Sequence, residues 1–254
     1  MNQWLGFLKK EWHESVKSYK LLLVTVIFSI LGILNPFTAK ITPVLLEKLM
    51  PAGTTMQLPE PTALDSWLQF YKNVPQMGLI VLILLFSTMM SKELEKGTLT
   101  ILLTKGLRRS TVVITKYVTA IYYWTFAISL SFAITYAYTA YYWDQSSLQH
   151  LFFSVSCLYV FGCLLLAVTL WGNTYFATSY GGIVVTFVGI IGLFIASIFP
   201  VPSTWSPLEL AVAPPQLLTG AVVPVDLLVP YLLTLCLTLL FVGLTVIHFK
   251  RKLL

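Results

Sequence analysis

The sequence predicts an all-α membrane protein that crosses the bilayer six times. Of the 254 residues, 57% are apolar and only 10% are charged, whereas about 25% of the residues of a typical soluble domain are charged. The apolar residues form long runs that lack the alternation of a barrel strand. Because backbone groups find no water inside a bilayer, such runs must form helices.

Six apolar segments form one transmembrane domain that covers residues 1–254. A span requires about twenty residues to cross the roughly 30 Å hydrocarbon core. The predicted spans are Leu21–Phe37, Pro75–Met90, Val113–Tyr142, Leu148–Leu170, Tyr180–Phe199 and Asp226–Phe249. The second is the weakest because its uncharged run is short, and an earlier start in SWLQFYKNV is the alternative.

The distribution of positive charge predicts the orientation. If the N-terminus is inside, thirteen of the sixteen Lys and Arg residues fall in the inner segments, and only Lys40, Lys48 and Lys72 fall outside. The positive-inside rule then places both termini in the cytoplasm. The formal net charge of +6 is thus explained by orientation, and we expect no nucleic-acid partner.

The first twenty residues predict an amphipathic helix in the inner headgroup layer, in contact with membrane lipids. Trp4, Leu8, Trp12 and Val16 recur every four residues, and charged residues occupy the other faces. The alternative is an ordinary first turn of a long span. The segment lacks the pattern of a cleaved secretory signal, so we expect none of it to be removed.

Two outer connections are long. The first runs from about Thr38 to Val74, and within it LDSWLQFYK predicts a short helix, capped by Asp65, that rests on the outer surface. The connection before the sixth span is rich in proline yet apolar. This composition favours a broken segment of short helices that dip back into the membrane, with a partly buried lid as the alternative.

Small residues recur along one face of the first span and of the fifth span. Such faces let helices approach closely, within a subunit or across a dimer, and the same side chains could instead border a substrate path. The residues are Thr25, Ser29 and Gly32 in the first span and Gly182, Thr186 and Gly189 in the fifth.

The sequence contains no recognisable catalytic or metal-binding motif. The middles of the six predicted spans contain no Asp, Glu, Lys, Arg or His, and the three cysteines lie in apolar runs. HExxH, GxSxG and the phosphate loop GxxxxGK[ST] are also absent. We therefore expect no catalytic residue and no cofactor in this chain, and any nucleotide must be bound by another polypeptide.

The segment after the second span, SKELEKGTLTILLT, predicts one short cytoplasmic helix. Ser91 can cap it, and Glu93 and Glu95 lie near the positive end of its dipole. Gly97 weakens such a helix by about 1 kcal/mol relative to alanine, unless a bend or a close contact is needed there.

The longer stretch SKELEKGTLTILLTKGLRRSTVVITKYV resembles the corresponding segment of type-2 ABC (ABC-2) exporter permeases, particularly the small six-span bacterial subunits. The shared pattern is an acidic pair, Gly-Thr, a leucine-rich stretch, one or two Arg and a Lys that opens the third span. The matching residues are Glu93, Glu95, Gly97, Thr98, Leu102, Leu103, Arg108, Arg109 and Lys116. The overall layout of the chain is similar as well.

The resemblance implies that residues 91–109 form a coupling helix in a groove of a cytoplasmic ATPase subunit. Two permease subunits, identical or paralogous, would then form a dimer above two ATPases that bind ATP and Mg²⁺. Glu93, Glu95, Arg108 and Arg109 would make docking contacts, while Gly97, Thr98 and Leu102 would shape the helix. The alternative is that these charges only enforce orientation.

The resemblance further implies export across the bacterial cytoplasmic membrane by a non-catalytic subunit. The apolar spans favour an amphipathic peptide, a lipid or a hydrophobic drug as substrate. The alternative function is a non-transporting immunity or sensing protein that binds an extracellular peptide or lipid. The charge-free spans disfavour a membrane enzyme that acts on lipids.

Overall fold

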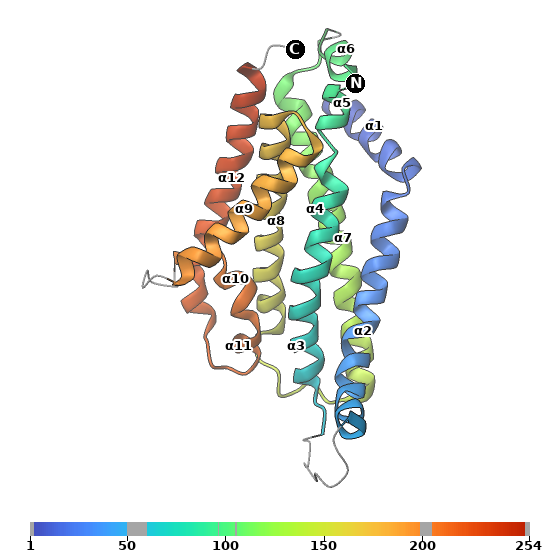
Figure 1. Cartoon of the computed structure of the whole chain (residues 1–254), viewed down its shortest axis with the longest axis vertical. Helices are drawn as coiled ribbons and strands as arrows, with labels where there is room; N and C mark the ends of the chain where they lie inside the picture. The colour runs from blue at the N-terminus through green and yellow to red at the C-terminus, as the bar shows by residue number, and fades with distance from the viewer. Residues whose placement is uncertain (1–2, 50–59, 96, 105, 199–204, 252–254) are drawn as a thin grey trace.

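The computed structural model describes residues 3–49, 60–95, 97–104, 106–198 and 205–251, and every regular element in these ranges is helical (Figure 1). The all-α prediction is therefore confirmed for the described part of the chain. The elements are α1 (Gln3–Lys17), α2 (Lys20–Leu49), α3 (Ala63–Asn73), the π-turn η1 (Val74–Gly78), α4 (Leu79–Ser87), α5 (Ser91–Glu95), α6 (Thr98–Thr104), α7 (Arg109–Tyr142), α8 (Leu151–Phe176), α9 (Ser179–Ile198), α10 (Glu209–Val212), α11 (Pro214–Leu218), the 3₁₀ turn η3 (Pro224–Leu227) and α12 (Leu228–Arg251).

Six helical segments are long and apolar enough to cross a membrane, which confirms the predicted number. They are Lys20–Leu45, Ala63–Glu93, Arg109–Tyr142, Leu151–Phe176, Ser179–Ile198 and Pro224–Arg251. Figure 1 shows α1, α5, α6 and the C-terminal end of α12 together at one end of the bundle. We call this end the α5 end.

The first span continues beyond the predicted boundary at Phe37, and α2 passes through two prolines to Leu49. The predicted loop from Thr38 is therefore wrong as far as Leu49. Pro36 lacks an N–H, so the carbonyl of Gly32 loses its helical partner. The hydroxyl of Thr135 on α7 donates to that carbonyl at 3.1 Å, which explains how the helix tolerates this proline.

The second span begins earlier than Pro75, because α3, η1 and α4 follow one another without a break. The predicted surface helix is therefore wrong: Trp67 and Phe70 on α3 are fully buried in the main core. The helix also starts before Asp65, which is the third residue of α3. The carboxylate of Asp65 accepts a hydrogen bond from the backbone N–H of Thr62 at 2.8 Å. The alternative start in SWLQFYKNV is closer to the structure.

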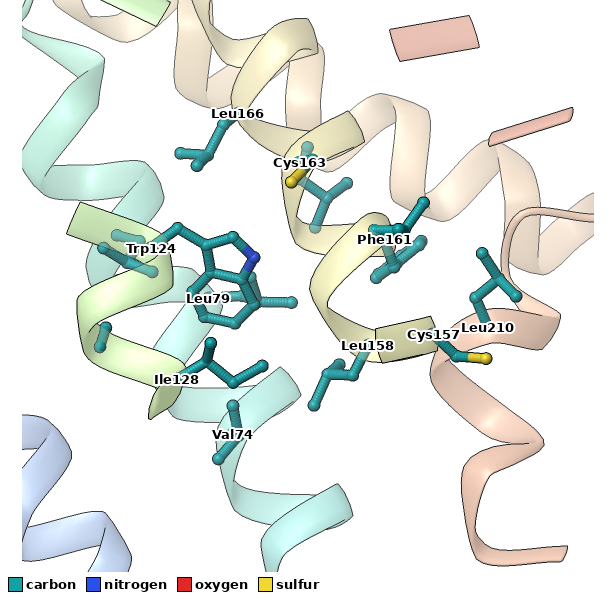
Figure 2. Packing of buried hydrophobic residues seen from close by; sticks show 14 of the residues in the cluster. Val74, Leu79, Trp124, Ile128, Cys157, Leu158, Phe161, Cys163, Leu166 and Leu210 are labelled. Atoms are coloured by element: carbon teal, nitrogen blue, oxygen red, sulfur yellow. The ribbon is translucent and has the colours of Figure 1, made fainter. Parts of the chain in front are cut away.

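The contact between α7 and α8 centres on Trp124. Its indole is fully buried, and its Nε1–H donates to the carbonyl of Tyr159 at 2.9 Å. Figure 2 shows the ring pointing from α7 toward α8. Gly162 permits this approach, because a Cβ there would lie 2.5 Å from Trp124 Cε2. Of the six candidate spans, α8 is the most buried: 72% of its most apolar 18-residue stretch lies inside the protein.

The connection before the sixth span contains the short helices α10 and α11, which confirms the prediction of a broken helical segment. Leu210, Leu217 and Leu218 are buried within the main core. The backbone N–H of Gln149, just before α8, donates to the carbonyl of Leu218 at 3.1 Å. The segment is thus fixed to the end of the bundle opposite the α5 end (Figure 1).

Candidate functional site

The segment between the second and third spans folds as two short helices, and the prediction of one continuous helix is wrong. Gly97 separates α5 from α6 with a left-handed φ of +66°. Apart from the two adjacent residues, no atom of the described residues lies within 4 Å of the position that a Cβ would occupy. The backbone conformation at the bend therefore explains this glycine, and close packing does not. Ser91, the predicted cap, is the first residue of α5, and its hydroxyl lies 2.7 Å from that of Ser179.

Glu93 on α5 is buried and belongs to a cluster of charges at the α5 end. Its carboxylate pairs with Lys10 of α1 and with Lys116 of α7, whose Nζ lies 2.8 Å from Glu93 Oε2. Glu11 of α1 also accepts from Lys116 at 3.1 Å. Glu14 pairs with Lys10 at 3.0 Å. We call these five residues the charge cluster.

Lys116 is the most buried member of the charge cluster, with 1% of its surface exposed. Besides its two carboxylate partners, its Nζ donates to the carbonyl of Met89 at 2.8 Å. Met89 follows the end of α4, where carbonyls lack helical partners and the helix dipole is negative. One ammonium group therefore joins α1, α5, α7 and the end of α4.

The helix α1 contacts the bundle through Phe7, Glu11 and Ser15, which are buried and four residues apart. The predicted apolar stripe lies elsewhere on the helix: Trp4 and Trp12 are more than a third exposed. Figure 1 shows α1 running obliquely along the outside of the bundle at the α5 end. The Phe7, Glu11 and Ser15 face contacts the protein. Trp12 of the apolar stripe packs edge-on against Tyr122 of α7, with 4.7 Å between the ring centroids, and the exposed part of the stripe remains available to lipid.

The electrostatics of the charge cluster keep Lys10 protonated. Burial alone would lower the pKa of Lys10, but attraction to Glu11, Glu93 and Glu14 outweighs burial and raises the pKa above its ordinary value. A raised pKa in the folded state means that this pairing stabilises the protein throughout the physiological range and is lost only in strong alkali.

Metal binding does not fit the charge cluster well. The carboxylates of Glu11, Glu14 and Glu93 lie within 4.8 Å of one another. Lys10 and Lys116 already supply positive charge to the same oxygens. The arrangement is therefore an ion-pair network that connects helices.

The remaining residues of the predicted coupling segment have different surroundings. Arg109 donates to the carbonyls of Phe249 and Lys250 at 3.0 Å each, which ties the start of α7 to the end of α12. Arg108 and Thr98 are exposed. The side chains of Glu95 and Leu102 lie outside the described residues, although their backbones belong to α5 and α6.

The small residues of the fifth span lie mainly against α8. A Cβ at Gly182 would lie 1.9 Å from Asn173 Oδ1, and the hydroxyl of Thr186 lies 2.8 Å from that of Thr169. Gly189 has open space around it and lines a cavity of about 210 Å³ that α8, α9 and α12 share.

In the first span, Gly32 lies against α7, where a Cβ would meet Ile134 at 2.9 Å. Thr25 and Ser29 are half-buried, and the hydroxyl of Thr25 donates to its own helix at Leu21. The three residues therefore differ in their surroundings, and only Gly32 makes a close helix contact.

Sequence reasoning missed Glu11 and Lys10, and treated Lys116 only as the residue that opens the third span. One signal was available for Lys116: it lies two turns inside α7, where an ionisable residue requires a partner. The Phe7, Glu11 and Ser15 face is weaker as a signal because it mixes apolar and polar residues.

These observations define a multi-pass membrane protein with six apolar helices and a charged cluster where the connection between spans two and three meets the bundle. The family model described as ABC-2 family transporter protein matches residues 6–230. The chain therefore belongs to the ABC-2 family of membrane transport proteins. A comparison with curated proteins gives no match.

Proposed function

We propose that this chain is the membrane-spanning subunit of an ATP-driven exporter and that α5 and α6 dock onto a separate ATPase. The observation that carries the proposal is the connection of α5 to α1 and α7 through Glu93, Lys10 and Lys116 in a member of this family. A force applied to α5 would reach two further helices through the charge cluster.

The ends of other spans are linked to the same region. Arg109 connects the start of α7 with the end of α12, and Lys116 binds the carbonyl of Met89 at the end of α4. ATP can switch the permease only if the ATPase binds two states of α5 and α6 with different affinities. We infer that such a difference moves spans two, three and six together.

The proposed docking residues differ in their exposure. Glu93 is 7% exposed and faces its own chain, so we assign it a positioning role. Arg108 is exposed at the α5 end and is available to the ATPase. Thr98, which the resemblance assigns to shaping the helix, is exposed as well. Glu95 remains a docking residue in the proposal.

We also propose a second permease subunit, identical or paralogous, and an amphipathic or hydrophobic substrate. Only 17% of the most apolar 18-residue stretch of α9 is buried, and only 22% of the corresponding stretch of the last span. The exposed faces of these spans are apolar, which supports contact with a second subunit, substrate or lipid. The proposed direction of transport is export, as the family resemblance implies.

The test is retention of an ATPase by the chain isolated from its native membrane. We expect vanadate-sensitive ATP hydrolysis to copurify with the wild type, and the double variant Glu95→Lys, Arg108→Glu to lose most of it. The matched control is Lys72→Glu, because Lys72 is exposed near the opposite end. A wild type without an ATPase would contradict the proposal and favour a non-transporting binding protein. Equal losses in the two variants would remove the docking role.

A further inference from the structure

A groove lies between α1 and α7 on the outside of the bundle, where the rings of Trp12 and Tyr122 pack edge-on with their centroids 4.7 Å apart. Nothing in the proposed coupling function uses this groove. It has a volume of about 520 Å³, within the range of about 300–1,000 Å³ that is typical of small-ligand sites. Leu5, Leu8 and Trp12 line it from α1, and Val118 and Tyr122 line it from α7. The walls of the groove are therefore almost entirely apolar.

The groove lies at a depth where hydrocarbon is expected. Val118 and Tyr122 are nine and thirteen residues after Arg109, the first residue of α7. At a rise of 1.5 Å per residue, they lie roughly 14 and 20 Å along the helix. Leu5, Trp12 and Tyr122 are between 39% and 51% exposed, so the groove faces the surroundings of the bundle.

Among the described residues that line this apolar groove, one has a charged side chain, Lys9. Lys9 is exposed, and it forms no ion pair with the described residues. The adjacent Lys10 differs, because it pairs with three carboxylates. The positive charge at the groove is therefore available to an external anion.

We propose that this groove binds a membrane phospholipid with an anionic headgroup. An acyl chain occupies the groove between the apolar walls. Lys9 binds the phosphate, since a long lysine side chain can extend to the headgroup layer. An apolar channel with one free cation is complementary to an anionic amphiphile. A partner helix would need both an apolar face for the groove and an acidic side chain opposite Lys9, whereas one anionic phospholipid supplies both.

Binding at this groove would stabilise α1 against α7. Glu11, on the buried face of the same helix, pairs with Lys116 of α7. Lipid on one side of α1 and the charge cluster on the other side thus favour the same position of α1. The proposed lipid site does not depend on ATPase docking, and its test requires no ATPase.

The experiment measures lipid retention by the full chain in nanodiscs of phosphatidylcholine with and without phosphatidylglycerol, followed by native mass spectrometry. We expect the wild type to retain phosphatidylglycerol selectively and Lys9→Glu to reduce this retention about fivefold, the effect of one lysine at an anionic surface. Lys17→Glu is the matched control: Lys17 is exposed on α1 and does not line the groove. It should retain the lipid like the wild type.

A second variant tests the groove itself. Val118→Trp places a larger side chain among the apolar walls, and we expect retention of both phospholipids to fall, with the helix content unchanged by circular dichroism. Equal effects of Lys9→Glu and Lys17→Glu would show diffuse surface attraction and overturn the proposal. Unchanged retention by Val118→Trp would also overturn it. If Lys9→Glu does not fold, Lys9→Gln gives the same comparison.

Discussion

The ammonium group of Lys116 on α7 contacts groups on α1, on α5 and at the end of α4. It contacts Glu11 on α1, Glu93 on α5 and the carbonyl of Met89 at the end of α4. A buried charge is tolerated only when partners replace water, and removal of one partner leaves the others uncompensated. The positions of α1 and α5 relative to α7 therefore depend strongly on this side chain.

Replacement of Lys116 by methionine should destabilise the protein. Met fills a similar volume but leaves Glu11 and Glu93 with Lys10 as their only cation within the charge cluster. We expect a loss of about 3–5 kcal/mol, which corresponds to a fall in Tm on the order of 10 °C. Thermal unfolding of the detergent-solubilised protein measures this change.

Two further variants distinguish the charge cluster from a general effect of lysine loss. Lys92 is exposed on α5, so Lys92→Met should leave Tm nearly unchanged. Adding Glu93→Gln to Lys116→Met removes one of the two carboxylates that lost Lys116 as a partner and should recover part of the lost stability. Strictly additive losses would show that Glu93 and Lys116 do not interact.

At the scale of elements, the long spans could be predicted because length and hydropathy are local properties. The start of the second span could not, because Lys72 and Asn73 resemble a loop. In the structure, Asn73 donates to Asn35 Oδ1 at 2.9 Å, and Lys72 is exposed. The pairing of Glu11 with Lys116 joins residues 105 apart in the chain, and no local pattern contains that information.

The bend between α5 and α6 provides a prediction at the same scale. Gly97→Ala introduces a Cβ into a left-handed backbone conformation, which costs about 1–2 kcal/mol. Beyond the adjacent residues, no atom in the part of the chain that the structure describes would clash with this Cβ, so we expect the strain to be confined to the bend. We expect hydrogen exchange across residues 91–104 to accelerate about tenfold, with little change in the other helices.

Gly189→Ala is the control for this strain. Gly189 has equally open surroundings but lies within α9, where alanine is favoured over glycine by about 1 kcal/mol. Exchange across residues 91–104 should therefore remain as in the wild type. If hydrogen exchange across residues 91–104 is the same in Gly97→Ala as in the wild type, the bend does not need a left-handed backbone conformation at this position.

At the scale of the whole molecule, burial is distributed unevenly among the spans. The most apolar 18-residue stretch of α8 is 72% buried, whereas that of α9 is 17% buried. In a bilayer, apolar exposure is compatible with lipid, so it does not by itself require a partner. The charged ends of the bundle are more informative about orientation, because the distribution of Lys and Arg determines which end faces the cytoplasm.

Cysteine labelling tests this orientation. In a variant without Cys157, Cys163 and Cys236, single cysteines replace Lys92 on α5 and Ser147 between α7 and α8, both of which are exposed. A membrane-impermeant maleimide added to intact cells should label Ser147→Cys and should label Lys92→Cys only after permeabilisation.

The expected labelling follows from charge, because thirteen of the sixteen Lys and Arg residues lie in the segments assigned to the cytoplasm, and translocating such segments is unfavourable. The outcome also decides whether α5 can meet ATP. Labelling of Lys92→Cys in intact cells would place α5 and α6 outside the cell, away from ATP, and the coupling proposal would fail even though the six helices and the charge cluster would be unchanged. Protection of the α5 site leaves that end accessible only from the cytoplasm, where an ATPase can bind.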